Sequence, residues 1–104
     1  MEKQELEILV RTENGTVVLV LKGRLNTITS PDLQAKINQI VPDLQFLDLD
    51  FTEVEHIASA GLRVLAATDE RLEGNGGKLR VLHPNAAVRE VLDMTGFSDI
   101  LTIV

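Results

Sequence analysis

The hydrophobic pattern of this chain changes repeatedly between a period of two residues and a period of about 3.6, and this alternation constrains the fold more than any other feature. Strand-like segments occupy residues 5–11, 16–21, 46–51 and 78–83, and helix-like segments occupy residues 31–41, 60–73 and 85–95. Beyond the first two strands, helices and strands alternate along the chain. Strands joined by a helical crossover run parallel, so we expect a mixed α/β sheet with right-handed crossovers.

The first two strands are expected to form an antiparallel hairpin. Leu6, Ile8 and Val10 recur at alternate positions of the first strand, and Asn14-Gly15 supplies the two positive φ angles of a tight turn. The second segment, residues 16–21, is apolar on both faces, which is typical of a strand inside a covered sheet. We therefore place the second strand nearer the centre of the sheet.

The ends of the helices are marked by capping and breaking residues. Ser30-Pro31-Asp32 is interpreted as an N-cap, a proline at the first helical position and an acid in the first turn, and Pro42 ends this helix. The second helix ends at residues 74–77, and the third runs from Pro84-Asn85 to Gly96. Each helix carries one apolar stripe, so we expect about three helices packed mainly on one face of the sheet. Residues 1–104 are expected to form one domain, with residues 100–104 left unassigned.

Composition excludes several classes of function. The chain has 10 Lys and Arg against 16 Asp and Glu, a net charge of −6, and only 3% aromatic residues, which argues against direct nucleic-acid binding. It has no cysteine, so it forms no disulfide and no thiolate metal site. Its apolar runs are too short to span a bilayer, and its first residues do not resemble a signal peptide. We expect a cytoplasmic protein without membrane insertion.

Catalytic and metal-binding patterns are weak. His56 and His83 lie in different predicted loops without other ligands at metal-binding spacing. Asp48 and Asp50 share one strand face and could bind a cation, but a solvated or hydrogen-bonded strand end is the favoured interpretation. The glycines of residues 74–77 lack the Lys and Ser or Thr of a phosphate-binding loop. We expect no catalytic residue, no metal and no cofactor.

Residues 57–63 differ in kind, because an apolar strand end is followed by small residues, a serine and a helix. In one interpretation Ser59 is only the N-cap of that helix. In the other, Ser59 carries a phosphate, since a helix N-terminus tolerates an anion. Gly61 lies just inside the helix, where glycine costs about 0.5–1 kcal/mol relative to alanine, so we expect it to permit the close approach of backbone or of a partner. On that basis Gly61→Ala should leave stability equal or higher and weaken partner binding.

At these residues the chain resembles the STAS domain family, and within it the bacterial anti-sigma-factor antagonists. The segment of residues 57–65 is similar to the family's Asp/Ser-Ser-x-Gly-Leu stretch, with Ser59 at the phosphorylated position. Four further segments are similar to family features in the same order: 21–26, 47–49, 76–79 and 86–96. The order and spacing of all five segments make the resemblance specific.

The resemblance implies a binding protein and not an enzyme. Such antagonists, when unphosphorylated, bind an anti-sigma factor that is also a serine kinase; phosphorylation breaks the complex and a PP2C-type phosphatase reverses it. The implied phosphorylation site is Ser59, and the implied partner-binding residues are Asn26, Ala58, Ser59, Ala60, Gly61, Leu62 and Arg63. Ala58 and Asn26 stand where many phosphorylated members have an acidic or hydroxyl residue. One alternative is an unswitched STAS scaffold or regulatory subunit, as in lipid-transport or stress-sensing complexes. Another is an enzyme or small-molecule binder using Asp48, Asp50 or a pocket near Ser59.

Overall fold

A computed structural model describes residues 5–40 and 44–104 and shows a five-stranded mixed sheet in the order β1-β2-β3-β4-β5. The strands are β1 (Leu6–Glu13), β2 (Thr16–Leu25), β3 (Phe46–Ile57), β4 (Lys78–Leu82) and β5 (Thr102–Ile103). The helices are α1 (Ser30–Ile40), α2 (Ser59–Gly74), α3 (Ala86–Met94) and the short 3-10 helix η1 (Phe97–Asp99). Only β1 and β2 pair antiparallel; the other neighbours are parallel, as expected from their crossovers.

The hairpin turn has the predicted geometry. Asn14 and Gly15 have φ angles of 52° and 82°, and they place Glu13 opposite Thr16. The remaining residues of β1 then face β2 in one continuous register as far as Leu6. The prediction of an antiparallel hairpin with β2 on the inner side is confirmed.

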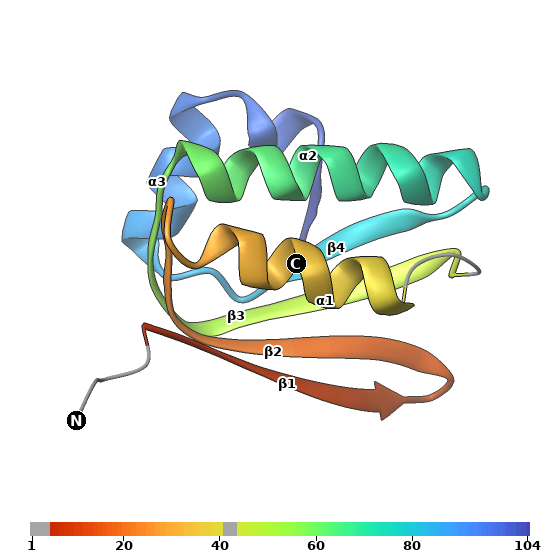
Figure 1. Cartoon of the computed structure of the whole chain (residues 1–104). Coiled ribbons are helices and arrows are strands. Elements are labelled where there is room, and N and C mark those ends of the chain that lie inside the picture. The colour runs from red at the N-terminus through yellow and green to blue at the C-terminus, as the bar shows by residue number, and fades with distance from the viewer. Residues whose placement is uncertain (1–4, 41–43) are drawn as a thin grey trace.

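The three α-helices lie on one side of the sheet, with α1 and α2 side by side (Figure 1). Leu47, Leu49 and Phe51 of β3 are fully buried, as the alternation predicted. The other face of the sheet carries no helix among residues 5–40 and 44–104, so the interpretation of residues 16–21 as a strand covered on both sides is wrong. Val18 is buried and Val20 half-buried on that open face, opposite Asp48 and Asp50 of β3.

Both inner strands are longer than the sequence pattern predicted. β2 continues to Leu25 and β3 to Ile57, with shifts of register along the way, and the two ends face each other as a pair. The ladder between the strands holds these extensions, although their sequences no longer alternate regularly. The extra residues carry the chain to the N-termini of α1 and α2.

The start of α1 also differs from the prediction. Ser30 is the first residue of the helix, and its hydroxyl is buried without a hydrogen-bond partner among the described residues, so its assignment as an N-cap is wrong. Pro42, the predicted end of the helix, lies outside the described residues. At α3 the prediction holds: the Asn85 side chain accepts a hydrogen bond from the Val88 amide. No helix of the described segments is long and apolar enough to cross a membrane.

Candidate functional site

The candidate site lies at the carboxyl ends of the neighbouring parallel strands β2 and β3. Leu25 and Ile57 are paired there, and the Ala58 amide donates to the Leu25 carbonyl at 2.8 Å. The loop that follows β2 and the first turn of α2 are therefore held next to each other. In Figure 1 both helices begin at this same end of the sheet.

The first turn of α2 exposes the hydroxyl of Ser59. Ala58 occupies the N-cap position with φ −110° and ψ 175°, and its carbonyl accepts from the amides of Gly61 at 2.9 Å and Leu62 at 3.1 Å. Ser59 is the first helical residue; it is exposed, and its hydroxyl has no hydrogen bond within the described chain. The interpretation of Ser59 as only an N-cap is therefore wrong. Because alanine cannot cap, the first amides of α2 lack a side-chain acceptor.

Asn26 organises the loop between β2 and α1. Its Oδ1 accepts from the amides of Ile28 at 2.9 Å and Thr29 at 3.0 Å, and the Thr29 hydroxyl accepts from the Asn26 amide at 3.0 Å. This reciprocal arrangement is that of a capping box. The Asn26 side-chain amide also donates to Glu5 Oε1 at 3.0 Å. The residue predicted to contact a partner thus has a structural role, and it is half-buried.

Two of the predicted partner-binding residues lie inside the molecule. Leu62 is 6% exposed and belongs to the core. Gly61 is buried, and a Cβ atom placed on it would lie 3.0 Å from both Leu25 Cβ and Ile57 Cγ1. Of the two alternatives expected for Gly61, close approach of backbone or of a partner, the structure supports close packing within the chain: Gly61 makes room for the ends of β2 and β3. Neither residue offers a side chain to a partner in this conformation.

The exposed part of the site extends from α2 onto α1. Ser59 and Arg63 are four residues apart, which places them on one face of α2, and both are exposed. Arg63 also borders a shallow groove between the two helices. The groove is lined by Thr27, Ser30, Pro31, Gln34, Ala60, Arg63 and Val64. We call the set Asn26, Ala58, Ser59, Ala60 and Arg63 the Ser59 surface.

The contribution of α1 to this groove was not predicted from the sequence. Pro31 and Gln34 of α1 and Thr27 of the preceding loop belong to no motif that indicated this site, and only the packing of α1 against α2 brings them beside Ala60. The groove is mostly apolar in character, with Arg63 as its charged residue. The first turn of α2 contains no acidic residue, so the positive end of the helix dipole is not neutralised there by a side chain.

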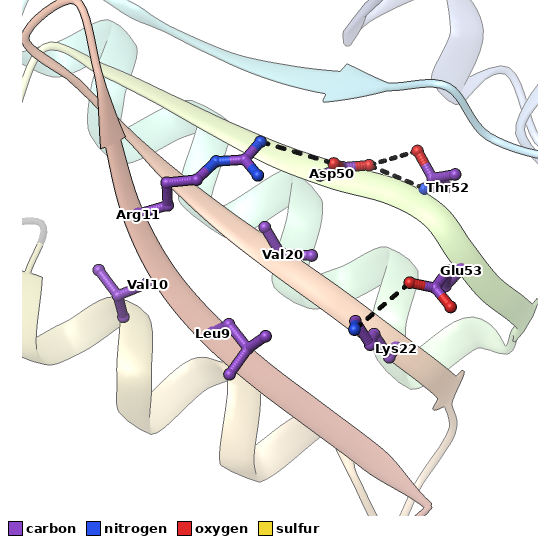
Figure 2. Close-up of a pocket in the computed structure, with 8 residues that line it drawn as sticks. All are labelled: Leu9, Val10, Arg11, Val20, Lys22, Asp50, Thr52 and Glu53. Atoms are coloured by element: carbon purple, nitrogen blue, oxygen red, sulfur yellow. Dashed lines mark hydrogen bonds and ion pairs between the residues drawn. The ribbon is translucent and has the colours of Figure 1, made fainter.

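The two aspartates of β3 have structural partners on the open face. The prediction placed both at the end of the strand, whereas β3 continues beyond them to Ile57. Asp48 is 4% exposed and accepts two hydrogen bonds from Arg80, at 2.8 and 2.6 Å. Asp50 accepts from the amide and hydroxyl of Thr52 at 2.9 and 2.6 Å, with Arg11 3.9 Å away (Figure 2).

These contacts also fix the charge state of Asp50. Burial by itself would raise the pKa of its carboxyl, but the hydrogen bonds from Thr52 and the charges of Arg11 and His83 together hold the pKa below its ordinary value. Asp50 is therefore an ionised hydrogen-bond acceptor on the open face of the sheet. On a separate point, the described residues contain no group of three or more His, Cys, Asp or Glu side chains that could hold a metal ion.

Comparison with known proteins gives a consistent picture. Residues 7–104 match the family model of the STAS domain. The chain is 32% identical over 92 residues to the anti-sigma-F factor antagonist RsfB of Mycobacterium tuberculosis, covering 88% of this chain and 75% of that protein. An anti-sigma factor antagonist from Mycobacterium paratuberculosis has a similar structure, with a TM-score of 0.85, 29% identity and coverage of 94% and 84% of the two chains. The antagonist SpoIIAA in its unphosphorylated form has a TM-score of 0.81 at 21% identity, covering 94% and 88%, and supports the fold.

Proposed function

The chain belongs to the STAS domain family, and on that premise we propose that it is an anti-sigma factor antagonist that binds its anti-sigma factor through the Ser59 surface. The observation that carries the proposal is the position of Ser59 at the first turn of α2. Ser59 is exposed, its hydroxyl makes no hydrogen bond within the described chain, and the helix has no side-chain cap. Two similar proteins support the same function: the antagonist RsfB, which is 32% identical to this chain in sequence, and the structurally similar antagonist from Mycobacterium paratuberculosis. The protein acts in this proposal by binding and not by catalysis.

The surface offers small, partly exposed groups with one cation. Ala58 and Ala60 are half-buried and flank Ser59, so a partner's backbone can approach closely. Arg63 provides a charged group on the same face of α2. Gly61 and Leu62, buried beneath, support this surface and do not contact the partner. The groove between α1 and α2 continues the surface and adds apolar contact area.

We further propose that phosphorylation of Ser59 switches this binding off. A phosphate adds about −1.5 to −2 charges at neutral pH. In the free domain the uncapped amides of α2 and the nearby Arg63 stabilise that charge, since no acidic side chain lies in the first turn. In a complex, the same phosphate would be desolvated against the partner, which costs several kcal/mol when the charge is not paired. The fold is therefore retained while affinity is lost.

Ala58 fits this switch in spite of its difference from the family pattern. An Asp or Ser at this N-cap position would bond the first amides and stabilise the helix by about 1 kcal/mol. With Ala58 at the cap, those amides stay available to a phosphate on the next residue. We expect the phosphorylated domain to unfold at a temperature equal to or higher than that of the unmodified domain.

The test is a phosphorylation and binding experiment. The protein is incubated with the candidate anti-sigma factor kinase and ATP, the phosphate is located by mass spectrometry, and both forms are titrated against that partner. Ser59→Ala should bind without regulation and Ser59→Asp more weakly. Ala67→Asp is the matched control, because Ala67 is exposed two turns further along α2 and gains the same charge. A PP2C-type phosphatase should restore binding of the phosphorylated form.

The second candidate function is an unswitched STAS subunit of a lipid-transport or stress-sensing complex. It shares the same binding surface, and the alanine at position 58 is the observation that favours it, because many phosphorylated members carry an acid or hydroxyl there. Phosphate at another residue, or equal affinity of the two forms, would reject the switch and favour this function.

A further inference from the structure

Strand β1 leaves one edge of the sheet open. In the part of the chain that the structure describes, β1 pairs only with β2, and its other side is free along the whole strand. Two large apolar residues on it are exposed, Leu9 at 44% and Val10 at 52%. Proteins usually protect such edges with charged side chains, proline or a bulge; the strand has no proline, lysine or bulge, and its charged residues are Glu7, Arg11 and Glu13. An edge of this kind is a template for a further strand.

The hairpin determines which backbone groups point to that free edge. In a two-residue turn the flanking residues, here Glu13 and Thr16, form a hydrogen-bonded pair. At the other end, the Glu5 carbonyl accepts from the Arg24 amide at 2.8 Å. Odd-numbered residues of β1 therefore bond to β2, because bonded and non-bonded pairs alternate. The amides and carbonyls that point outward belong to Leu6, Ile8, Val10 and Thr12.

We propose that β1 pairs antiparallel with β1 of a second copy of this chain, with Leu9 opposite Leu9 of the second copy. In this register Ile8 lies opposite Val10 of the second copy, and Leu6 opposite Thr12, so outward-pointing groups face each other in every hydrogen-bonded pair. A slip of one residue would place outward groups opposite inward ones and lose the hydrogen bonds. The strand is thus complementary to itself in its backbone.

The side chains are complementary in the same register. On the open face of the sheet, Glu7 lies opposite Arg11 of the second copy, and the symmetry repeats this charge pair on the other side of Leu9. A slip of two residues in one direction would instead place Glu7 opposite Glu13, which repels. A slip in the other direction would place Glu7 opposite Leu9 and Arg11 opposite Glu5, and it would shorten the overlap of β1 with its copy. In the proposed register Glu5, which precedes β1 and accepts a hydrogen bond from Asn26, lies opposite Glu13 of the second copy. The length of the overlap and the two Glu7–Arg11 pairs together favour the proposed register among those that the hydrogen bonds allow.

Existing ion pairs leave these side chains available. Glu7 has no ion pair within the described residues, and Lys22, which lies opposite it, is paired with Glu53 at 3.5 Å. Arg11 contacts Glu13 at 2.6 Å, and its side chain is half exposed. Its contact with Asp50, at 3.9 Å, is shown in Figure 2. Exposed pairs of this kind contribute little, so Arg11 can exchange partners at small cost. The backbone bonds and the apolar contacts supply the affinity, and the charges select the register.

The symmetry axis would be perpendicular to the sheet, so the helices of both copies would lie on the same side of a continuous sheet. Because the strands of the second copy run in the opposite direction, the two Ser59 residues would lie at opposite ends of the dimer. Each copy keeps its Ser59 surface free, since that surface is built on β3, α2 and the β2–α1 loop. The dimer would be bivalent, and its formation does not depend on the proposed function.

The experiment is sedimentation of the full chain from about 1 µM to about 1 mM, a range that covers weak to moderate dimers. It is run at physiological ionic strength, which screens the net charge of −6 on each copy. We expect a concentration-dependent dimer. Val10→Pro removes an outward amide and should give a folded monomer, because proline is tolerated at a free edge. Val10→Thr keeps that amide and should still dimerise; circular dichroism confirms that both variants fold.

The register is tested by charge exchange and by cross-linking. Glu7→Lys and Arg11→Glu should each weaken the dimer about tenfold or more, and the double variant should restore it. Leu9→Cys should form an intermolecular disulfide on oxidation, since opposite Cα atoms in a non-hydrogen-bonded pair lie about 4.5 Å apart. The chain has no other cysteine, and Thr12→Cys should not cross-link. A monomer at every concentration, a dimer that survives Val10→Pro, or a double variant that stays weak would overturn the proposal.

Discussion

Replacing Gly61 by alanine separates the role of this glycine in packing from a role in partner binding. Alanine gains about 0.5–1 kcal/mol over glycine inside a helix. The added Cβ would lie 3.0 Å from Leu25 Cβ and from Ile57 Cγ1. Leu25 is fully buried and its Cβ is fixed to the backbone of β2, so it cannot move aside without shifting the strand. Overpacking of this kind costs about 1–3 kcal/mol, and it outweighs the gain in helix propensity.

We therefore expect Gly61→Ala to lower the free energy of unfolding by about 1–2 kcal/mol, which would lower the melting temperature by about 4–8 °C per kcal/mol in a domain of this size. Urea unfolding followed by circular dichroism measures the change. The matched control is Gly74→Ala at the last residue of α2, where a Cβ meets no atom within 4 Å. That variant should gain stability. A Gly61→Ala protein as stable as the parent, with weaker partner binding, would refute the packing argument and restore the original expectation.

Two other substitutions test the remaining structural assignments. Asn26→Ala removes the acceptor of the capping box and should cost about 1–2 kcal/mol in urea unfolding, whereas an Asn26 that acts only in binding would leave stability unchanged. The pKa of Asp50 is held below its ordinary value in the folded state, so its contribution to stability is present above the unfolded pKa of about 3.9 and is lost as the pH falls through the lowered value. Asp50→Asn should therefore be destabilising near neutral pH and lose most of that difference under strongly acidic conditions; a difference independent of pH would contradict this.

The sequence predicted those features whose causes are local. The alternation in residues 46–51 identified the buried face of β3, because neighbouring side chains of a strand point to opposite sides. Asn14-Gly15 predicted the hairpin, since few other dipeptides adopt two positive φ angles in succession. The start of α2 was placed within a residue of its position by the small residues around Ser59.

Tertiary structure alone decided how these elements use their side chains. Ser30 and Ser59 are both serines at the start of a helix. The hydroxyl of Ser30 is buried without a hydrogen-bond partner among the described residues, whereas Ser59 is exposed. This difference depends on how each helix packs in the fold and not on the local sequence. Gly61 is held by the ends of β2 and β3, contacts that depend on the register between strands 30 or more residues apart in the chain. Local preference fixes where a helix or strand forms; which atoms meet across the sheet follows only from the packing of the whole chain.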